Sequence, residues 1–145
     1  MENLYKKFTN ILSSNNYKLT KQRKDILKIL IQNKDKHFTA DSLLDKVKEI
    51  NKDIGLATIY RNLELFCKLN ITSELDFDSP YKYYELNVIN EHHHHLVCLN
   101  CDKIIEFNDE VLEEFESELE NKYEFEIVKH QIKFYGICKE CKKSK

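Results

Sequence analysis

The chain has no tryptophan, only one proline and only two glycines among its 145 residues. It has no Gly/Ser-rich linker and no low-complexity segment. No apolar run approaches the ~20 residues that a helix needs to cross a bilayer. The first seven residues lack the apolar stretch of a secretory signal peptide. Because of these absences, we expect a cytoplasmic protein with no membrane partner.

The composition is that of a folded globular protein, with 41% hydrophobic and 33% charged residues. A length of 145 residues suffices for one ordinary domain or two small ones. The net charge of −2 is unevenly distributed: residues 1–84 carry 15 Lys/Arg against 11 Asp/Glu, and residues 85–145 carry 8 against 14. A basic half can face phosphates, whereas an acidic half suits a cation site or a partner surface.

Apolar residues recur at helical spacing in the first half of the chain, and two threonines stand at N-cap positions. Two strand-like runs then flank Asp78-Ser79-Pro80, which is a hairpin turn. This order predicts a winged helix-turn-helix domain over residues 1–84, with helices over 4–14, 20–32, 39–50 and 57–68 and strands over 71–77 and 81–88.

The second half has a different order of elements, which predicts a small α/β lobe over residues 85–145 and an α+β protein overall. We expect strands over 92–99 and 104–107 and a helix capped by Asn108 or Asp109. A third strand is predicted over 123–135, which are rich in aromatic and β-branched residues.

Four of the five cysteines form two C-x-x-C pairs, Cys98/Cys101 and Cys138/Cys141, separated by 36 residues. Two such turns complete a tetrahedral thiolate site for Zn²⁺, which has no open position and is therefore structural. The alternatives are redox disulfides and ordinary buried cysteines. A protein without a signal sequence is not expected to hold stable disulfides. Cys67 stands apart in an apolar helix and is interpreted as a core residue.

Four consecutive histidines, His92 to His95, occupy a predicted strand. Because alternate side chains of a strand point to opposite faces, His92 and His94 share one face and His93 and His95 the other. One segment could thus supply two metal sites, and imidazoles with nearby carboxylates suit Fe²⁺, Mn²⁺, Zn²⁺, Co²⁺ or Ni²⁺. The alternative is a solvated histidine-rich loop.

The predicted helix over 57–68 buries Ile59 and Leu63, which leaves a polar face on the other side. That face offers a small residue for close approach, an aromatic ring for thymine methyls and an arginine for guanine or phosphate. An ordinary amphipathic helix with a solvated polar face is the alternative. Basic residues near the second helix, including Lys18, could bind phosphates.

In this order and spacing, the motifs resemble the ferric uptake regulator family of metal-dependent transcriptional repressors from about residue 15 to 141. The matching blocks are residues 19–23, 37–40, 56–63, 92–95, 98–101, 105–107, 130 and 136–141. The resemblance implies a homodimer that binds an inverted-repeat operator in double-stranded DNA when a regulatory metal is bound. It also implies that the C-terminal α/β lobe is a dimerisation domain.

The resemblance further implies which residues fill each site. Structural zinc is assigned to Cys98, Cys101, Cys138 and Cys141. The regulatory site is assigned to His37, Glu85, His93, His95 and Glu106, and a second metal site to His92, His94, Glu113 and His130. DNA contacts are assigned to Lys18, Ala57, Thr58, Tyr60 and Arg61.

The family divides by the signal sensed, and the residues at two ligand positions favour iron here. The zinc-sensing branch commonly has Cys where this chain has Glu85, and the peroxide-sensing branch favours Asp at Glu85 and Glu106. The expected regulatory ion is therefore Fe²⁺, with Mn²⁺ or Zn²⁺ as alternatives, and peroxide or zinc sensing as the alternative function.

Outside the family, a metal-dependent hydrolase and a metal store remain as rival interpretations. A hydrolase could use His and Glu ligands around an open metal, but the chain has no H-E-x-x-H motif. Neither rival gives a role to the basic helical half, and we expect a regulator that is not an enzyme.

Overall fold

A computed structural model of the chain describes residues 2–88, 93–128 and 130–143. It divides into two compact units, Met1–Ile89 and Asn90–Lys145. The sequence predicts a division between residues 84 and 85. In the structure, Glu85 belongs to the N-terminal unit.

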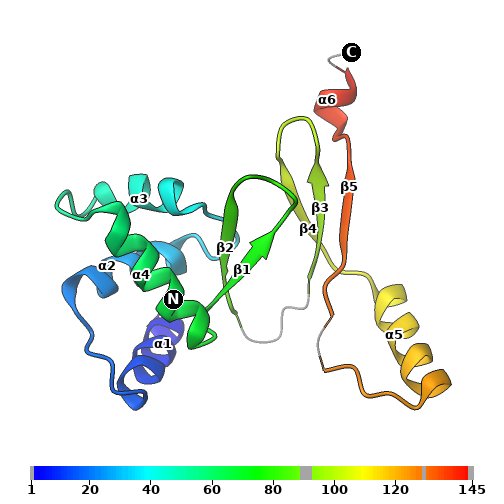
Figure 1. Ribbon diagram of the computed structural model, residues 1–145, viewed down its shortest axis with the longest axis horizontal. Coiled ribbons are helices and arrows are strands. Elements are labelled where there is room, and N and C mark those ends of the chain that lie inside the picture. The colour runs from blue at the N-terminus through cyan, green and yellow to red at the C-terminus, as the bar shows by residue number, and fades with distance from the viewer. Residues whose placement is uncertain (1, 89–92, 129, 144–145) are drawn as a thin grey trace. The chain divides into compact units, whose positions relative to one another are not determined.

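The N-terminal unit is built from four helices followed by a two-stranded hairpin (Figure 1). Thr20 and Thr39 cap the second and third helices, where each side chain accepts a hydrogen bond from the backbone N–H three residues on. The elements are α1 (Glu2–Ser14), α2 (Lys21–Gln32), α3 (Ala40–Lys48), α4 (Leu56–Lys68), β1 (Thr72–Asp76) and β2 (Lys82–Leu86).

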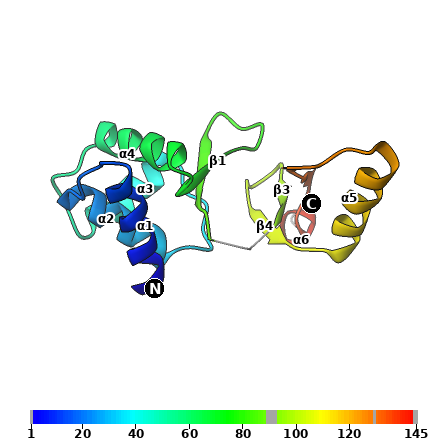
Figure 2. The ribbon, with the colours of Figure 1, turned by 90° about the horizontal axis from the view of Figure 1, so that it is seen from below.

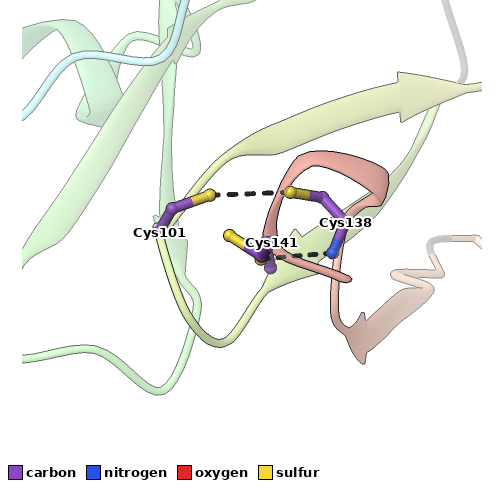
Figure 3. Close-up of side chains that lie close together, drawn as sticks. Cys101, Cys138 and Cys141 are labelled. Atoms are coloured by element: carbon purple, nitrogen blue, oxygen red, sulfur yellow. Dashed lines mark hydrogen bonds between the residues drawn. The ribbon is translucent and has the colours of Figure 1, made fainter. Parts of the chain in front are cut away.

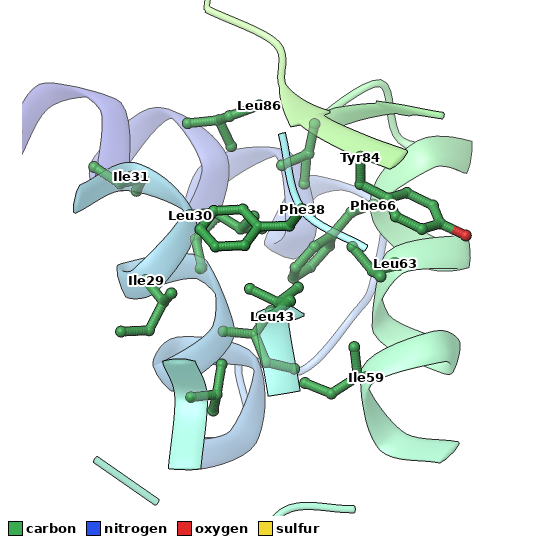
Figure 4. Close-up of a cluster of buried hydrophobic side chains, with 14 of the residues drawn as sticks. Ile29, Leu30, Ile31, Phe38, Leu43, Ile59, Leu63, Phe66, Tyr84 and Leu86 are labelled. Carbon is green, nitrogen blue, oxygen red and sulfur yellow. The ribbon is translucent and has the colours of Figure 1, made fainter. Parts of the chain in front are cut away.

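One apolar core holds these four helices and the hairpin together. Phe8 of α1, Leu43 of α3, and Leu63 and Phe66 of α4 are fully buried in it. Tyr84 of β2 reaches the same core, so the hairpin is packed against the helices (Figure 4). The helix pair α3–α4 followed by a packed hairpin is the winged helix-turn-helix that the sequence predicts.

The C-terminal unit is a three-stranded sheet in the order β4-β3-β5 (Figure 1). One long helix is joined to it, as Figure 2 shows from another side. β3 (His94–Cys98) pairs antiparallel with β4 (Ile104–Phe107) and parallel with β5 (Lys133–Gly136). The long helix α5 (Glu110–Tyr123) connects β4 to β5, and a short helix, α6 (Lys139–Lys143), follows. Asp109 caps α5 by accepting a hydrogen bond from the N–H of Val111.

The predicted strand over residues 123–135 is wrong for most of its length, because among its described residues only the last three, in β5, are in a strand. Ile127 donates its backbone N–H to the side chain of Glu120, 2.7 Å away, and Phe125 donates its own to the Glu120 carbonyl at 3.1 Å. This segment therefore folds back on the end of α5. His130 consequently lies before β5 rather than within a strand.

Candidate metal centres and nucleic-acid interface

The four cysteines of the two C-x-x-C pairs meet at one end of the C-terminal sheet. Cys98 is the last residue of β3, and it lies beside Gly136, the last residue of β5, in the parallel pairing. The turns that follow the two strands therefore lie side by side, and all four sulfur atoms are within 4.8 Å of one another. Figure 3 shows three of these side chains converging, with Cys101 Sγ 3.8 Å from Cys138 Sγ. The parallel pairing of β3 with β5 is what closes the 36-residue separation in sequence.

The thiols of this cluster differ in how readily they ionise. The backbone N–H of Cys138 donates to Cys98 Sγ at 3.3 Å, and this bond is the first cause that lowers the pKa of Cys98 to about 6. The pKa of Cys138 is raised to about 12: a backbone hydrogen bond with Cys141 favours the thiolate, but burial and side-chain hydrogen bonds favour the thiol more. One thiolate thus makes its neighbours harder to ionise unless a bound cation balances the charge. The donors fit a divalent metal that prefers sulfur.

Two of the predicted regulatory ligands lie together in the N-terminal unit. His37 stands between α2 and α3, and Glu85 lies on β2. Nε2 of His37 is 3.2 Å from Oε2 of Glu85, and their side chains are only 8% and 12% exposed. A backbone bridge fixes this pairing, because Phe38 and Tyr84 exchange both hydrogen bonds, at 2.9 and 2.7 Å. The result is an imidazole and a carboxylate held at ligand distance.

Three further predicted regulatory ligands lie together in the C-terminal unit. His95 on β3 stands opposite Glu106 on β4 in the antiparallel ladder. The rings of His93 and His95 meet edge to face at 5.1 Å between centroids. Each of the three side chains offers a ligand atom within 4.8 Å of the other two. Two imidazoles and one carboxylate make a set of donors that suits Fe²⁺.

The opposite face of β3 carries a second group of imidazoles. The ring of His94, which is 2% exposed, lies 5.3 Å from that of His130 and 5.4 Å from that of Phe107. This is the predicted alternation, since His94 and the His93–His95 pair have different neighbours. His92 was assigned to the same site, but it lies outside the described residues.

Glu116 is a carboxylate beside His130 that the sequence alone did not single out. Its Oε2 lies 2.8 Å from Nδ1 of His130, whereas Glu113, which was assigned to this site, is exposed one turn earlier on α5. Helical spacing could have pointed to Glu116 as well as Glu113, because residues three apart occupy neighbouring positions on one helix face. Glu113 and Glu116 were therefore equally consistent with that face of α5.

The predicted DNA-contacting residues lie on an accessible surface of the N-terminal unit. On α4, Ala57 and Arg61 are exposed, Tyr60 is 42% exposed and Thr58 is half-buried. Arg61 Nη2 donates to Thr58 Oγ1 at 3.3 Å, which holds the guanidinium along the helix. Lys18 is exposed in the turn before α2. Side chains of these types at one helix face can contact base edges and phosphates.

A winged helix-turn-helix, in one chain with a lobe that carries clustered thiols and imidazoles, defines a metal-responsive transcriptional regulator. Comparison with known proteins agrees. The chain belongs to the ferric uptake regulator family, whose sequence model matches residues 14–135.

Relatives match almost the whole chain. The ferric uptake regulation protein of Bacillus subtilis is 36% identical over 97% of this chain and 96% of its own length. The solved ferric uptake regulator of Helicobacter pylori, described as having three functional metal-binding sites, is 29% identical with a TM-score of 0.86, covering 97% of this chain and 93% of its own. The Francisella tularensis regulator, solved with iron, is 34% identical with a TM-score of 0.78, covering 87% and 95%.

Within the part of the chain that the structure describes, no helix combines the length and the apolar character that crossing a bilayer requires.

The family consists of transcriptional regulators, and its members bind DNA.

Proposed function

We propose that this protein is an Fe²⁺-dependent repressor that binds an inverted-repeat operator as a homodimer and controls iron uptake genes. The proposal rests on two sets of imidazoles and carboxylates, one on each unit. They are His37 with Glu85, and His93 and His95 with Glu106. Neither set contains a thiolate, and carboxylate oxygens with imidazoles suit Fe²⁺ better than sulfur-rich sites do. The role is regulated binding and not catalysis. Because the protein would act on chromosomal DNA, we expect it in the bacterial cytoplasm.

The proposed regulatory site takes ligands from both sets. His93, His95 and Glu106 form the two-histidine, one-carboxylate arrangement that leaves positions on Fe²⁺ open. His37 and Glu85 are already at ligand distance from each other, and they would supply the rest. Because the two sets belong to different units, a shared ion would tie the DNA-binding domain to the dimerisation domain. Mn²⁺ and Zn²⁺ are the alternative ions for these donors.

Zn²⁺ is the ion proposed for the four cysteines, because a closed set of four thiolates is its usual structural site. His94, His130 and a carboxylate of α5 are proposed to form the second metal site, together with His92. The H. pylori relative, with its three functional sites, supports three centres in this chain.

A homodimer is supported by an apolar row across the C-terminal sheet. Ile105 on β4, Leu96 on β3 and Phe134 on β5 are direct neighbours in the strand register. They are 42%, 40% and 50% exposed. A contiguous exposed apolar patch usually marks an interaction surface. A second copy of this chain is the partner that the family implies for it.

In this proposal, operator binding depends on the spacing of the two recognition helices, one α4 from each protomer. Half-sites lie one or more helical turns apart, so both helices enter major grooves together only at particular angles between the domains. Fixing those angles would raise the fraction of protein that is competent to bind, and affinity rises with that fraction.

The test is operator binding by protein purified without oxygen, after its metal content has been measured. About one zinc per chain, with operator binding that requires added Fe²⁺ or Mn²⁺, is the expected result. Binding that Fe²⁺ leaves unchanged but hydrogen peroxide abolishes would identify a peroxide sensor instead. An absence of operator binding with every ion would refute the proposal.

A further inference from the structure

The wing, which is the β1–β2 hairpin over residues 72–86, carries a buried aromatic residue that contacts a proposed regulatory ligand. Phe77 follows β1 directly and is 3% exposed. Its ring meets that of His37 edge to face, with 6.1 Å between centroids and 74° between planes. Edge-to-face packing of this kind is a directional attraction, so the orientation of one ring constrains the other. Both residues belong to the N-terminal unit.

The same ring also holds the turn of the wing. Phe77 packs against Tyr83 on β2, with 5.5 Å between centroids. Immediately after it, Asp78 adopts a left-handed φ of 53° and donates its N–H to Asp76 Oδ1 at 3.0 Å. The chain therefore turns at Asp78, and Phe77 is the side chain that anchors the turn inward, between β2 and His37.

The other side of His37 is fixed to the wing through its neighbour in sequence. The two hydrogen bonds between Phe38 and Tyr84 join the backbone of the α2–α3 connection to β2. Glu85, the partner of His37, is the next residue of that strand. The wing thus contacts the proposed ligand pair twice, through β2 at its base and through Phe77 near its turn.

We propose that Phe77 is a positioning residue that couples the regulatory metal site to the wing. The proposal rests on the function proposed above. An ion held by His37 and Glu85 fixes the plane of the imidazole, and Phe77 passes that orientation to residues 77–81. Without the ion, the imidazole of His37 keeps its contacts with Glu85 and Phe77 but lacks the metal bond that would lock its orientation, and the wing turn would be held less tightly. Metal binding would then order the wing turn inside the N-terminal unit, in addition to any effect on the angle between domains.

Coupling of this kind is reciprocal. If the metal orders the wing through Phe77, then a wing that is loosened at Phe77 must weaken metal binding. Residues that orient a ligand from behind typically change metal affinity by about 10- to 100-fold when they are substituted. Phe77→Leu keeps the apolar volume approximately but removes the ring edge, so we expect about a tenfold loss of Mn²⁺ affinity at the regulatory site.

The experiment measures hydrogen exchange of residues 76–83 in the zinc-loaded, full-length protein, with and without Mn²⁺, alongside Mn²⁺ affinity from the electron paramagnetic resonance signal of the free ion. In the unmodified protein, Mn²⁺ should slow exchange in this segment. In Phe77→Leu, the affinity should fall about tenfold, and saturating Mn²⁺ should no longer slow exchange.

Leu75→Ala is the matched control, because Leu75 lies on β1 and is 2% exposed. It should speed exchange with and without the ion, but saturating Mn²⁺ should still slow exchange in this variant, because Phe77 is intact. If Phe77→Leu behaves like the unmodified protein, the coupling is refuted. The coupling alone is also refuted if Mn²⁺ activates operator binding in the unmodified protein without slowing exchange in the wing. If Mn²⁺ does not activate operator binding at all, the proposed function fails first.

Discussion

The two units of this chain differ in what holds them together. The N-terminal unit has a continuous apolar core that runs from Phe8 on α1 to Leu86 on β2. In the C-terminal unit, only Val97, Cys98, His94 and His95 are buried among the described residues 93–143. Two of these four are imidazoles and one is a thiol that belongs to the cysteine cluster.

The difference shows that one sequence uses two ways of becoming stable. The first unit buries enough apolar surface to fold around its own side chains. The second leaves Leu96, Phe115 and Phe134 largely exposed, and it buries little apolar surface of its own. Metal ligation and a partner protomer are the remaining sources of stability for such a lobe. Perturbations should therefore separate the two units cleanly.

Loss of the thiolate site should have the largest effect. Structural zinc contributes an apparent ~10–16 kcal/mol to small zinc domains, and this binding energy is also folding energy. Cys98→Ser combined with Cys101→Ser should release about one zinc per chain, unfold the C-terminal unit and abolish the dimer, while α1 to α4 stay folded. Zinc analysis, sedimentation and residue-resolved hydrogen exchange would check this. A zinc-free protein that remained a stable dimer would show that the core of the lobe is sufficient.

A cavity in the helical core should destabilise the N-terminal unit and leave the C-terminal unit unaffected. Leu63→Ala removes a fully buried side chain from α4, which typically costs ~2–5 kcal/mol. Urea unfolding should show that loss in the N-terminal unit, with zinc content and dimerisation retained. If zinc were lost as well, the two units would not be independent in stability.

Substitutions on the exposed face of α4 should affect DNA binding and neither folding nor metal content. Tyr60→Ala and Arg61→Ala should each weaken operator binding by ~1–3 kcal/mol when they remove a base contact, measured at fixed salt. Lys122→Ala, on α5 of the other unit, is the control for a lost positive charge. Operator affinity that stays the same in both α4 variants would remove this helix from the interface.

The smallest expected effect distinguishes two carboxylates of α5. Because Glu116 contacts His130, Glu116→Gln should lower metal affinity at the second site by about tenfold. Glu113→Gln removes the same negative charge one turn away on α5 and is therefore the matched control. A larger loss from Glu113→Gln would restore the assignment made from the sequence.

Much of the fold could be predicted because local chemistry sets the ends of its elements. Thr20 and Thr39 each accept the backbone hydrogen bond that their position predicts, so α2 and α3 begin where the sequence places them. For α5 the sequence left Asn108 and Asp109 as alternative caps, and Asp109 is the one that accepts the bond. The alternation of the histidine strand also follows from strand geometry alone. The paired C-x-x-C spacing indicated a common site before any tertiary contact was known.

The remainder depended on partners distant in sequence. Phe125, Ile127 and Val128 have the composition of a strand, yet Val128 is 88% exposed and the segment bonds to Glu120. Strand propensity describes a side chain that fits a pleated surface and does not say whether a neighbouring strand exists. Likewise, spacing could not choose between Glu113 and Glu116, because the position of His130 decides which one is in contact.

In the proposed mechanism, the two imidazole–carboxylate sets form the site through which the regulatory metal controls DNA binding. The most direct measurement compares operator affinity with and without Fe²⁺ for His93→Ala/His95→Ala and for His94→Ala/His130→Ala, which removes the same number of imidazoles from the opposite face of the strand. The first variant should remain a zinc-loaded dimer but lose activation by Fe²⁺, and the second should keep it. If the first variant still requires Fe²⁺ to bind the operator and the second does not respond to it, the sensor lies at the second site and the account is wrong.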